Sequence, residues 1–308
     1  MSEIKHIIRS DQFDEKFLLE LFDIANDMKE RPHLYKCSLE GKIIFTMFFE
    51  PSTRTRLSFE RAIKKLGGTK FSTENANENS SGIKGETIED TISTLNGLEG
   101  HAVVLRHKDD DSSERAAALA KIPIINAGSG KAEHPTQGLL DLYTIYKYKR
   151  RLNNLRPAFL GDLAYGRTNH SLITMLLSLG NTEIHGVSSP ELALPDKYKD
   201  FITSKGAKYH EHYSLDDLPR DVDLIYHSRI QKERLNGEDL ARSMFTINKK
   251  VLDTFSKDTI LMHPLPRNEE IATCVDSDPR AVFFDQVNNG LYIRMAALHN
   301  LFNGKGAK

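Results

Sequence analysis

Apolar runs of strand length alternate with helix-like segments along most of this chain of 308 residues. Such runs lie at 43–49, 102–106, 122–126, 158–161, 183–187, 224–226, 260–262 and 282–284. Between several of them apolar residues recur at helical spacing, as in Phe59, Ile63 and Leu66. Strands separated by helices usually pair in parallel, because a helical crossover brings the chain back to the same end of the sheet. The sequence therefore predicts an α/β fold in which each of two domains is a parallel sheet flanked by helices.

The overall charge and the cysteine content exclude several classes of protein. The formal net charge is -1, so no global positive field attracts nucleic acid or anionic lipid. The longest apolar runs are far shorter than the roughly 20 residues that span a membrane. Cys37 and Cys274 are the two cysteines, and their spacing suits neither a metal site nor a disulfide framework. We expect a cytoplasmic protein with no membrane segment, no nucleic-acid partner, and no metal or organic cofactor.

Residues 52–56, which read Ser-Thr-Arg-Thr-Arg, form the strongest candidate binding segment. They lie between an expected strand and an amphipathic helix, where a helix start offers unpaired backbone N–H groups and a positive dipole end. Ser52, Thr53 and Thr55 add hydroxyl donors, and Arg54 adds a planar guanidinium suited to phosphate oxygens. Helix capping alone would explain Ser52 or Thr53. It would not explain so many donors and positive charges in one turn, so the segment predicts a phosphate site.

Five segments together resemble the aspartate/ornithine carbamoyltransferase family. The first is 49–56, which reads Phe-Glu-Pro-Ser-Thr-Arg-Thr-Arg. The others are 126–141 with Asn-Ala-Gly and His-Pro-Thr-Gln, 161–168 with Gly-Asp-Leu and Tyr-Gly-Arg-Thr, 229–234 with Arg-Ile-Gln-Lys-Glu-Arg, and 263–267 with His-Pro-Leu-Pro-Arg. They follow the family's order and extend through most of the chain, which argues against a chance match.

The resemblance implies a site for carbamoyl phosphate. The residues that match the family's binding positions are Ser52, Thr53, Arg54, Thr55, Arg106, His134, Gln137, Pro264 and Leu265. Arg54, Thr55, Arg106 and His134 are expected to act in catalysis, the last three by donating to the carbonyl oxygen as negative charge builds there. Preorganised donors of this kind can each contribute roughly 3–4 kcal/mol. Gln137 is expected to bind the carbamoyl amide, whose NH2 would face the backbone carbonyls of Pro264 and Leu265. A structural histidine is the alternative interpretation of His134.

The later segments bear on the second substrate. By the resemblance, Arg167 and Arg229 each meet a carboxylate of the acceptor, and Gln231 assists near its α-amino group. Two arginines suit a dicarboxylate. The ornithine enzymes carry a cysteine where this chain has Pro264, and they lack the Arg-x-Gln-Lys-Glu-Arg segment. The resemblance thus implies carbamoyl transfer to L-aspartate, giving N-carbamoyl-L-aspartate and phosphate, in de novo pyrimidine biosynthesis. A carbamoyltransferase for another amine and a noncatalytic anion-binding homologue remain alternatives, and surface ion pairs could also account for Arg229.

The polar segment 72–85 is too poor in apolar residues to anchor itself. In the family this loop enters the active site of an adjacent subunit, and Ser80 and Lys84 match the positions that it contributes, with Lys84 also reaching aspartate. The resemblance implies a homotrimer with shared active sites, whereas a mobile surface loop is the alternative. Whether regulatory chains or another pathway enzyme join the trimer stays open.

The resemblance also implies an arrangement of domains. We expect a carbamoyl phosphate-binding domain at 1–135, an aspartate-binding domain at 150–284, and a C-terminal helix at 286–304 that packs back on the first domain. Three positions depart from the family's commonest pattern: Ile83 and Ala164 replace basic residues, and Ser129 replaces an aspartate. None removes a residue assigned to chemistry, but the loss of two positive charges is expected to weaken anion binding.

Overall fold

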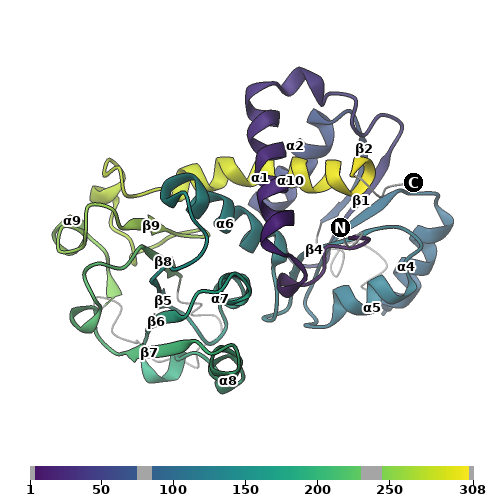
Figure 1. Ribbon diagram of the computed structural model, residues 1–308. Helices are drawn as coiled ribbons and strands as arrows, with labels where there is room; N and C mark the ends of the chain where they lie inside the picture. The colour runs from purple at the N-terminus through teal and green to yellow at the C-terminus, as the bar shows by residue number, and fades with distance from the viewer. Residues whose placement is uncertain (1–3, 75–84, 230–244, 305–308) are drawn as a thin grey trace. The chain divides into compact units, whose positions relative to one another are not determined.

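The chain divides into two compact units, each built around its own parallel sheet (Figure 1). The computed structural model describes residues 4–74, 85–229 and 245–304. The first unit comprises Met1–Leu140 and Asn288–Lys308, and the second comprises Asp141–Val287. Both unit boundaries fall inside helices.

The first unit contains a four-stranded sheet in the order β2-β1-β3-β4. Its strands are β1 (Ile43–Phe48), β2 (Thr69–Glu74), β3 (Ala102–His107) and β4 (Ile124–Ser129), and all neighbours pair in parallel. The helices that begin in it are α1 (Glu15–Glu30), α2 (Thr53–Lys65), α4 (Ile88–Gly97), α5 (Ser112–Leu119) and α6 (Pro135–Lys149). Phe45, Val103 and Leu105 pack with apolar residues of α4 and α5 on one face of the sheet. Ile44 and Phe48 alternate with these residues, so their side chains point to the opposite face.

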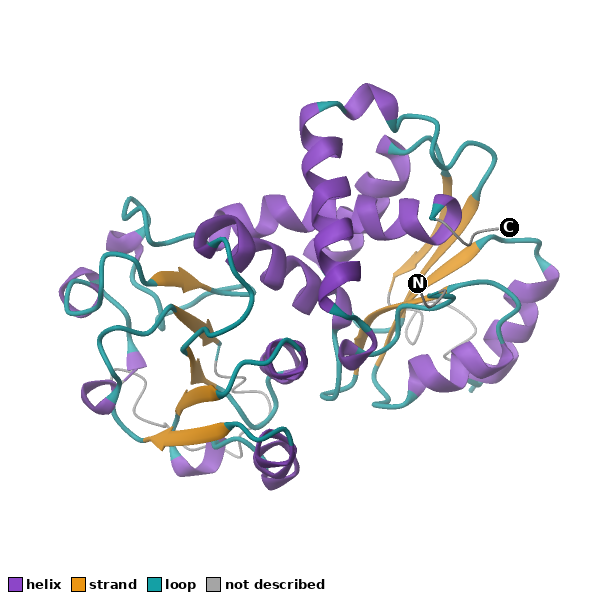
Figure 2. Cartoon of the chain, viewed as in Figure 1, coloured by secondary structure: helices purple, strands orange, loops and turns teal. Residues whose placement is uncertain are grey.

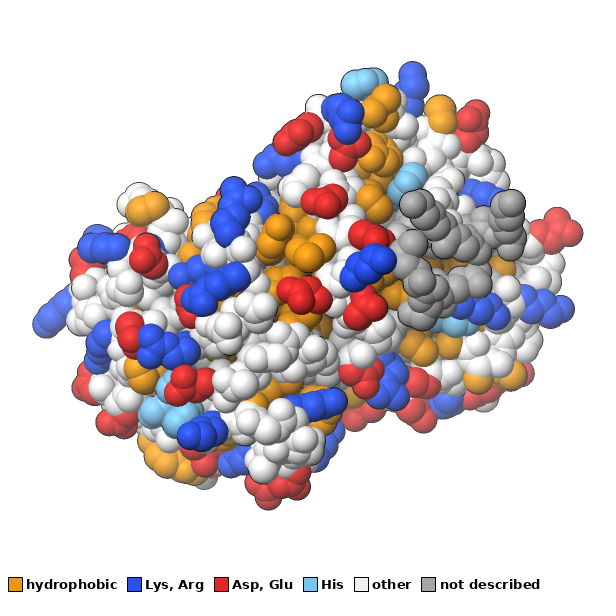
Figure 3. Space-filling view, in the orientation of Figure 1, with side chains coloured by type: hydrophobic (Ala, Val, Ile, Leu, Met, Phe, Trp, Pro, Cys, Tyr) orange, Lys and Arg blue, Asp and Glu red, His pale blue; other side chains and the backbone are white. Residues whose placement is uncertain are grey.

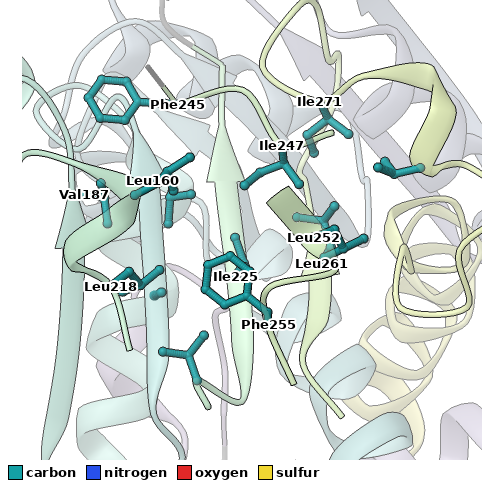
Figure 4. Packing of buried hydrophobic residues seen from close by; sticks show 14 of the residues in the cluster. Leu160, Val187, Leu218, Ile225, Phe245, Ile247, Leu252, Phe255, Leu261 and Ile271 are labelled. Atoms are coloured by element: carbon teal, nitrogen blue, oxygen red, sulfur yellow. The ribbon is translucent and has the colours of Figure 1, made fainter. Parts of the chain in front are cut away.

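The second unit contains a five-stranded parallel sheet in the order β7-β6-β5-β8-β9. Its strands are β5 (Pro157–Gly161), β6 (Glu183–Val187), β7 (Lys208–His212), β8 (Leu224–Ser228) and β9 (Ile260–Met262). Its helices are α7 (Arg167–Ser178), α8 (Asp196–Ser204) and α9 (Lys249–Leu252), and α10 (Phe283–Asn303) begins in it. Leu160, Ile225 and Leu261 come from three neighbouring strands and pack in one buried cluster with Leu252 and Phe255 (Figure 4).

The predicted fold class, two parallel α/β sheets flanked by helices, is confirmed. The apolar runs that form β1, β3, β4, β5, β6, β8 and β9 were recognised, but the strand expected at 282–284 was wrong. Helix α10 begins at Phe283, whose side chain is fully buried in the second core. A short buried apolar run does not reveal by periodicity whether it is strand or helix.

Two strands were missed, β2 and β7, and each lies at an edge of its sheet (Figure 2). Most residues of β2 are exposed, and those of β7 are exposed or half-buried. A strand that buries neither face needs no apolar run, so the sequence carries little sign of it.

The described surface carries charged side chains of both signs, with some apolar side chains exposed between them. Basic and acidic side chains lie among one another on the face shown in Figure 3, in keeping with the net charge of -1. Within the described residues, no helix combines the length and the apolar character needed to cross a bilayer.

Candidate active site

The predicted phosphate-binding segment lies where the strand order of the first sheet reverses. From β1 the chain adds β2 on one side, whereas β3 and β4 follow on the other side. Helix α2 starts at Thr53, just past the carboxyl end of β1. Phe48 of β1 is paired with Arg106 near the end of β3, so Arg106 lies at the same carboxyl end of the sheet. Open α/β sheets bind ligands at such reversal points, because the loops on either side diverge and leave a crevice.

The first turn of α2 exposes donors that the described part of the chain does not use. Ser52 is the N-cap residue, but its side chain makes no capping hydrogen bond, so the capping role considered above is not observed. Thr53 and Arg54 are exposed, and Arg54 has no hydrogen-bond or ion-pair partner among the residues that the structure describes. Partial desolvation lowers the pKa of the Arg54 guanidinium, which still stays charged at neutral pH. A cation at a helix N-terminus with no carboxylate partner is well prepared for a dianion.

Arg56, two residues further on, has a structural role instead. Its Nη1 lies 3.0 Å from Glu60 Oε1 and its Nη2 lies 2.7 Å from Glu74 Oε2. Glu60 also pairs with Lys70 and accepts a hydrogen bond of 2.7 Å from the Ser72 hydroxyl. Arg56 therefore ties α2 to the edge strand β2.

The Arg106 side chain is held between the ends of two other strands. Its Nε lies 3.6 Å from Glu50 Oε2, just after β1, and its Nη1 donates to the Ala127 carbonyl in β4 at 3.4 Å. The Arg106 side chain is 14% exposed, so these contacts restrict where the guanidinium can point. Glu50 was not predicted as a site residue, although it lies within the recognised segment.

The side chains of His134 and Thr55, which were predicted to share a role, lie next to each other. His134 is 3% exposed and immediately precedes α6, and its Nε2 lies 3.5 Å from Thr55 Oγ1. Its Nδ1 lies 3.4 Å from Thr136 Oγ1, a contact that orients the ring and was not predicted. Gln137 is buried in the first turn of α6, where its backbone N–H donates to the His134 carbonyl at 2.9 Å. Segments that lie far apart in the sequence thus bring their donors to one place.

The second sheet has its own reversal point, between β5 and β8. Arg167 opens α7 after β5, Arg229 follows β8 directly, and both are half-buried. The Asn169 amide fixes these ends together, because it donates to the Asp162 carbonyl at 2.7 Å and to the Ser228 hydroxyl at 3.0 Å. The structure thus positions both predicted acceptor-side arginines at the carboxyl ends of adjacent strands.

Gly161 permits the close approach of these two strands. It has a φ of +96°, and a Cβ there would lie 2.2 Å from the Ser228 carbonyl oxygen. A larger residue would be strained and would push β5 away from β8.

The loop after β9, which carries Pro264 and Leu265, is fixed by His263. The His263 Nδ1 accepts the Leu265 N–H at 2.8 Å, so the ring proton lies on Nε2, which is 2.9 Å from Glu270 Oε1. Burial alone would raise the pKa of Glu270, but hydrogen bonds from His263 and the Asn268 N–H lower it to about 2. The ionised Glu270 therefore sets the tautomer of His263, which in turn holds the loop.

Several predicted positions cannot be placed, and one departure has a local explanation. Gln231, Ser80, Lys84 and Ile83 lie outside the described residues. Ser129 is buried, and its hydroxyl lies 3.2 Å and 2.9 Å from those of two serines at the start of α5. An aspartate there would need a different set of partners.

Comparisons with known proteins agree along nearly the whole chain. The family model described as aspartate/ornithine carbamoyltransferase, carbamoyl-P binding domain, matches residues 5–147. The family model for the Asp/Orn binding domain of the same enzymes matches residues 153–301. The chloroplastic aspartate carbamoyltransferase of Oryza sativa subsp. japonica is 45% identical, over 97% of this chain and 85% of the relative. The aspartate carbamoyltransferase catalytic subunit of Methanocaldococcus jannaschii is 42% identical, over 97% of this chain and 98% of the relative.

Solved structures give the same result. The catalytic subunit of M. jannaschii aspartate transcarbamoylase superposes with a TM-score of 0.89 at 40% identity, covering 99% of this chain and 100% of that one. Aspartate transcarbamoylase from Trypanosoma cruzi, in complex with carbamoyl phosphate and aspartate, superposes with a TM-score of 0.88 at 36% identity, covering 96% of each chain. By sequence and by fold, this chain belongs to the aspartate/ornithine carbamoyltransferase family.

Proposed function

We propose that this protein is an aspartate carbamoyltransferase, which transfers the carbamoyl group of carbamoyl phosphate to the amino group of L-aspartate. The observation that carries the proposal is that Thr55 and His134 lie 3.5 Å apart at the first reversal point, beside Arg54, a cation that no described residue pairs with. The relatives named as aspartate carbamoyltransferases support the same reaction. The products are N-carbamoyl-L-aspartate and phosphate, and the reaction is a step of de novo pyrimidine biosynthesis.

In this proposal the first unit supplies the side chains that bind carbamoyl phosphate. The N-terminus of α2, with Ser52, Thr53 and Arg54, holds the phosphate. Thr55, Arg106 and His134 donate to the carbonyl oxygen. Their value is greatest in the transition state, since that oxygen becomes negative as the amine attacks. The carbamoyl NH2 is bound by Gln137 and by the backbone carbonyls of Pro264 and Leu265.

The chemical step needs few groups from the protein. The uncharged amine attacks the carbonyl carbon and forms the new C–N bond, and the C–O bond to the phosphate then breaks. We assign the proton released by the amine to the departing phosphate, which is basic enough to accept it. The main contribution of the protein is to hold the two reactants and to stabilise the developing charge.

The acceptor is assigned to the second unit. Arg167 and Arg229 follow adjacent strands, and each can meet one carboxylate of a dicarboxylate. Gln231 assists near the amino group in this proposal. L-Ornithine would place its cationic side chain beside these arginines, so it should be rejected through charge repulsion.

The assembly and location belong to the proposal as well. We propose a homotrimer in which Ser80 and Lys84 of one subunit complete the site of the next, with Lys84 reaching aspartate. A trimer by sedimentation, with activity lost on separation into monomers, is the expected result, and full specific activity of monomers would contradict it. The cytoplasm is the proposed location, because the exposed free thiols of Cys37 and Cys274 suit a reducing compartment.

The decisive experiment compares L-aspartate with L-ornithine in carbamoyl phosphate-dependent turnover. Turnover with aspartate alone is expected, and Arg229→Ala should lower kcat/KM for aspartate by roughly 100-fold or more, since a charged hydrogen-bonded pair is lost. The matched control is Arg220→Ala, which removes a surface arginine that precedes β8 instead of following it. This control should retain wild-type kcat/KM.

Other outcomes would change the proposal in different ways. Turnover with ornithine would overturn the acceptor while sparing the phosphate site. Turnover with a different amine in a competition series would assign another acceptor. Phosphate binding without turnover of any amine would favour the noncatalytic homologue.

A further inference from the structure

Three histidines and a glutamate gather on one face of the edge strand β7 and its neighbour β6. Glu183 and His185 alternate along β6, and His210 and His212 alternate along β7. His185 is paired in register with His210, so the four side chains share one face of the sheet. The sequence showed no metal site there, because its members come from two strands and β7 was not recognised.

Three possible ligand atoms of this cluster lie close together. Glu183 Oε1 lies 3.6 Å from His185 Nε2 and 3.2 Å from His210 Nε2, and all three atoms lie within 4.8 Å of one another. A tetrahedral ion with bonds of about 2.0–2.1 Å separates its ligand atoms by roughly 3.3 Å. Two of the three separations are thus close to those of a metal site.

Among the described residues, one ring nitrogen of the buried His185 lacks a hydrogen bond. His185 is 3% exposed, and its Nε2 has no hydrogen-bond partner among the described residues. The Nε2 of His210 is buried and lacks a hydrogen-bond partner in the same sense. Buried ring nitrogens are normally satisfied, so two such atoms that face one carboxylate point to a ligand between them.

His212 supplies the support that a metal-binding histidine needs. Its Nε2 lies 3.0 Å from His185 Nδ1. A metal ion on His185 Nε2 requires the ring proton on Nδ1, from which it can donate to His212 Nε2. Donation from Nδ1 would leave the Nε2 lone pair of His185 available to an ion. A neutral imidazole is the form that binds metals.

We propose that Glu183, His185 and His210 bind one divalent transition-metal ion of the Zn2+ type, with water in the remaining position. Two imidazoles and one carboxylate suit Zn2+ better than Mg2+ or Ca2+, which prefer oxygen ligands. The His185 and His210 rings are stacked at 4.7 Å between centroids. His210 would rotate to aim its lone pair at the ion, and it has room to do so because its side chain is 38% exposed.

This site is separate from the proposed acceptor site and independent of the proposed function. Glu183 begins β6, whereas Arg167 and Arg229 lie past the carboxyl ends of β5 and β8. The ion would join the edge strand β7 to β6 by coordinate bonds. Its expected effect is on the stability of the second unit, with carbamoyl transfer unchanged.

Zn2+ titration of untagged, chelator-treated full-length protein tests the proposal. Calorimetry should give one ion per chain for the wild type. His210→Asn and Glu183→Gln each remove a ligand and should weaken Zn2+ binding by roughly 100-fold or more. His212→Gln removes only the hydrogen-bond partner of His185, so it should weaken binding less, by ~10–100-fold. His33→Asn is the matched control, since it removes an exposed histidine of the first unit. It should bind Zn2+ as the wild type does.

A second readout separates metal binding from damage to the fold. Co2+ should give the intense visible absorption of a tetrahedral site in the wild type and in His33→Asn, but not in His210→Asn or Glu183→Gln. Zn2+ should raise the melting temperature of the wild type and of His33→Asn equally, and should leave that of His210→Asn and Glu183→Gln unchanged, while all variants melt alike without metal. Equal Zn2+ affinity in the wild type and His210→Asn, or no uptake by the wild type, would overturn the site. The cluster would then be a His210–Glu183 ion pair beside a ring stack.

Discussion

Arg54 and Arg56 are two residues apart, yet their surroundings predict opposite consequences when each is replaced by alanine. Arg54 is exposed and makes no hydrogen bond or ion pair among the described residues. Its loss should therefore change the free energy of unfolding by no more than about 0.5 kcal/mol. If it holds the phosphate through the transition state, its loss should lower kcat/KM for carbamoyl phosphate by roughly 100- to 1,000-fold, as for other donors to developing charge.

Arg56 should show the reverse pattern. Its side chain is 21% exposed and that of Glu60 is 10% exposed, so the pair lies between the surface and the buried limits. Exposed pairs are worth about 0.2–1 kcal/mol, and breaking a buried pair costs about 3–5 kcal/mol. Glu60 keeps Lys70 and Ser72 after the change, so we expect a loss of about 1–2 kcal/mol. For a chain of 308 residues, with an unfolding entropy of about 2.1 cal/mol/K per residue, this corresponds to a fall in melting temperature of roughly 1.5–3 °C.

Both quantities can be measured on the same preparations. Steady-state rates with varied carbamoyl phosphate are taken well below the melting temperature, and calorimetric melts are taken without substrate. The reasoning is refuted if Arg54→Ala destabilises the protein as much as Arg56→Ala does. It is equally refuted if Arg56→Ala loses activity as severely as Arg54→Ala while still folded.

Three further predictions concern the second unit. The pKa of Glu270 is about 2 in the fold against an ordinary value of 4.5, so its contribution to stability is present above about pH 4.5 and lost as the pH falls toward 2. In urea unfolding at several pH values, the free energy of unfolding of Glu270→Gln should therefore fall less steeply with acid than that of the wild type. Arg280→Met leaves the buried carboxylate of Asp278 without its guanidinium and should lower the free energy of unfolding by about 3 kcal/mol. Urea unfolding at pH 7 measures this change, and an unchanged midpoint would contradict the reasoning. Gly161→Ala should lower the melting temperature more than Gly180→Ala does, because both positions have positive φ but only the first would place a Cβ 2.2 Å from a facing carbonyl oxygen.

How far the fold could be predicted depended on which residues are buried. Strand β5 is buried throughout, and such strands show as continuous apolar runs. Strand β7, with Lys208 at its start and His212 at its end, lies at an edge and carries no such run. Phe283 belongs to an apolar run that suits a strand, yet it starts a helix. The run is apolar because Phe283 packs in the second core, and a short buried run of this kind is compatible with either element.

The candidate site shows the same division between local and long-range information. Thr55 and His134 were predicted from short segments that carry their own chemistry, and they meet in the structure. Partners that depend on strand register were missed, such as the Asn169 amide beside the Ser228 hydroxyl. Register is fixed by packing across the whole sheet, so a single segment does not reveal it.

The reversal of strand order in each sheet separates two kinds of evolutionary change. At a reversal point the residues that touch ligands belong to connecting segments, whereas the ladder hydrogen bonds belong to the strands. The segments after β5 and β8 could therefore change to suit a different amine while the buried residues of the second core stay the same. The first unit would keep the proposed binding residues for carbamoyl phosphate during such a change. Such independent inheritance explains how one scaffold can serve a family whose members differ mainly in the acceptor.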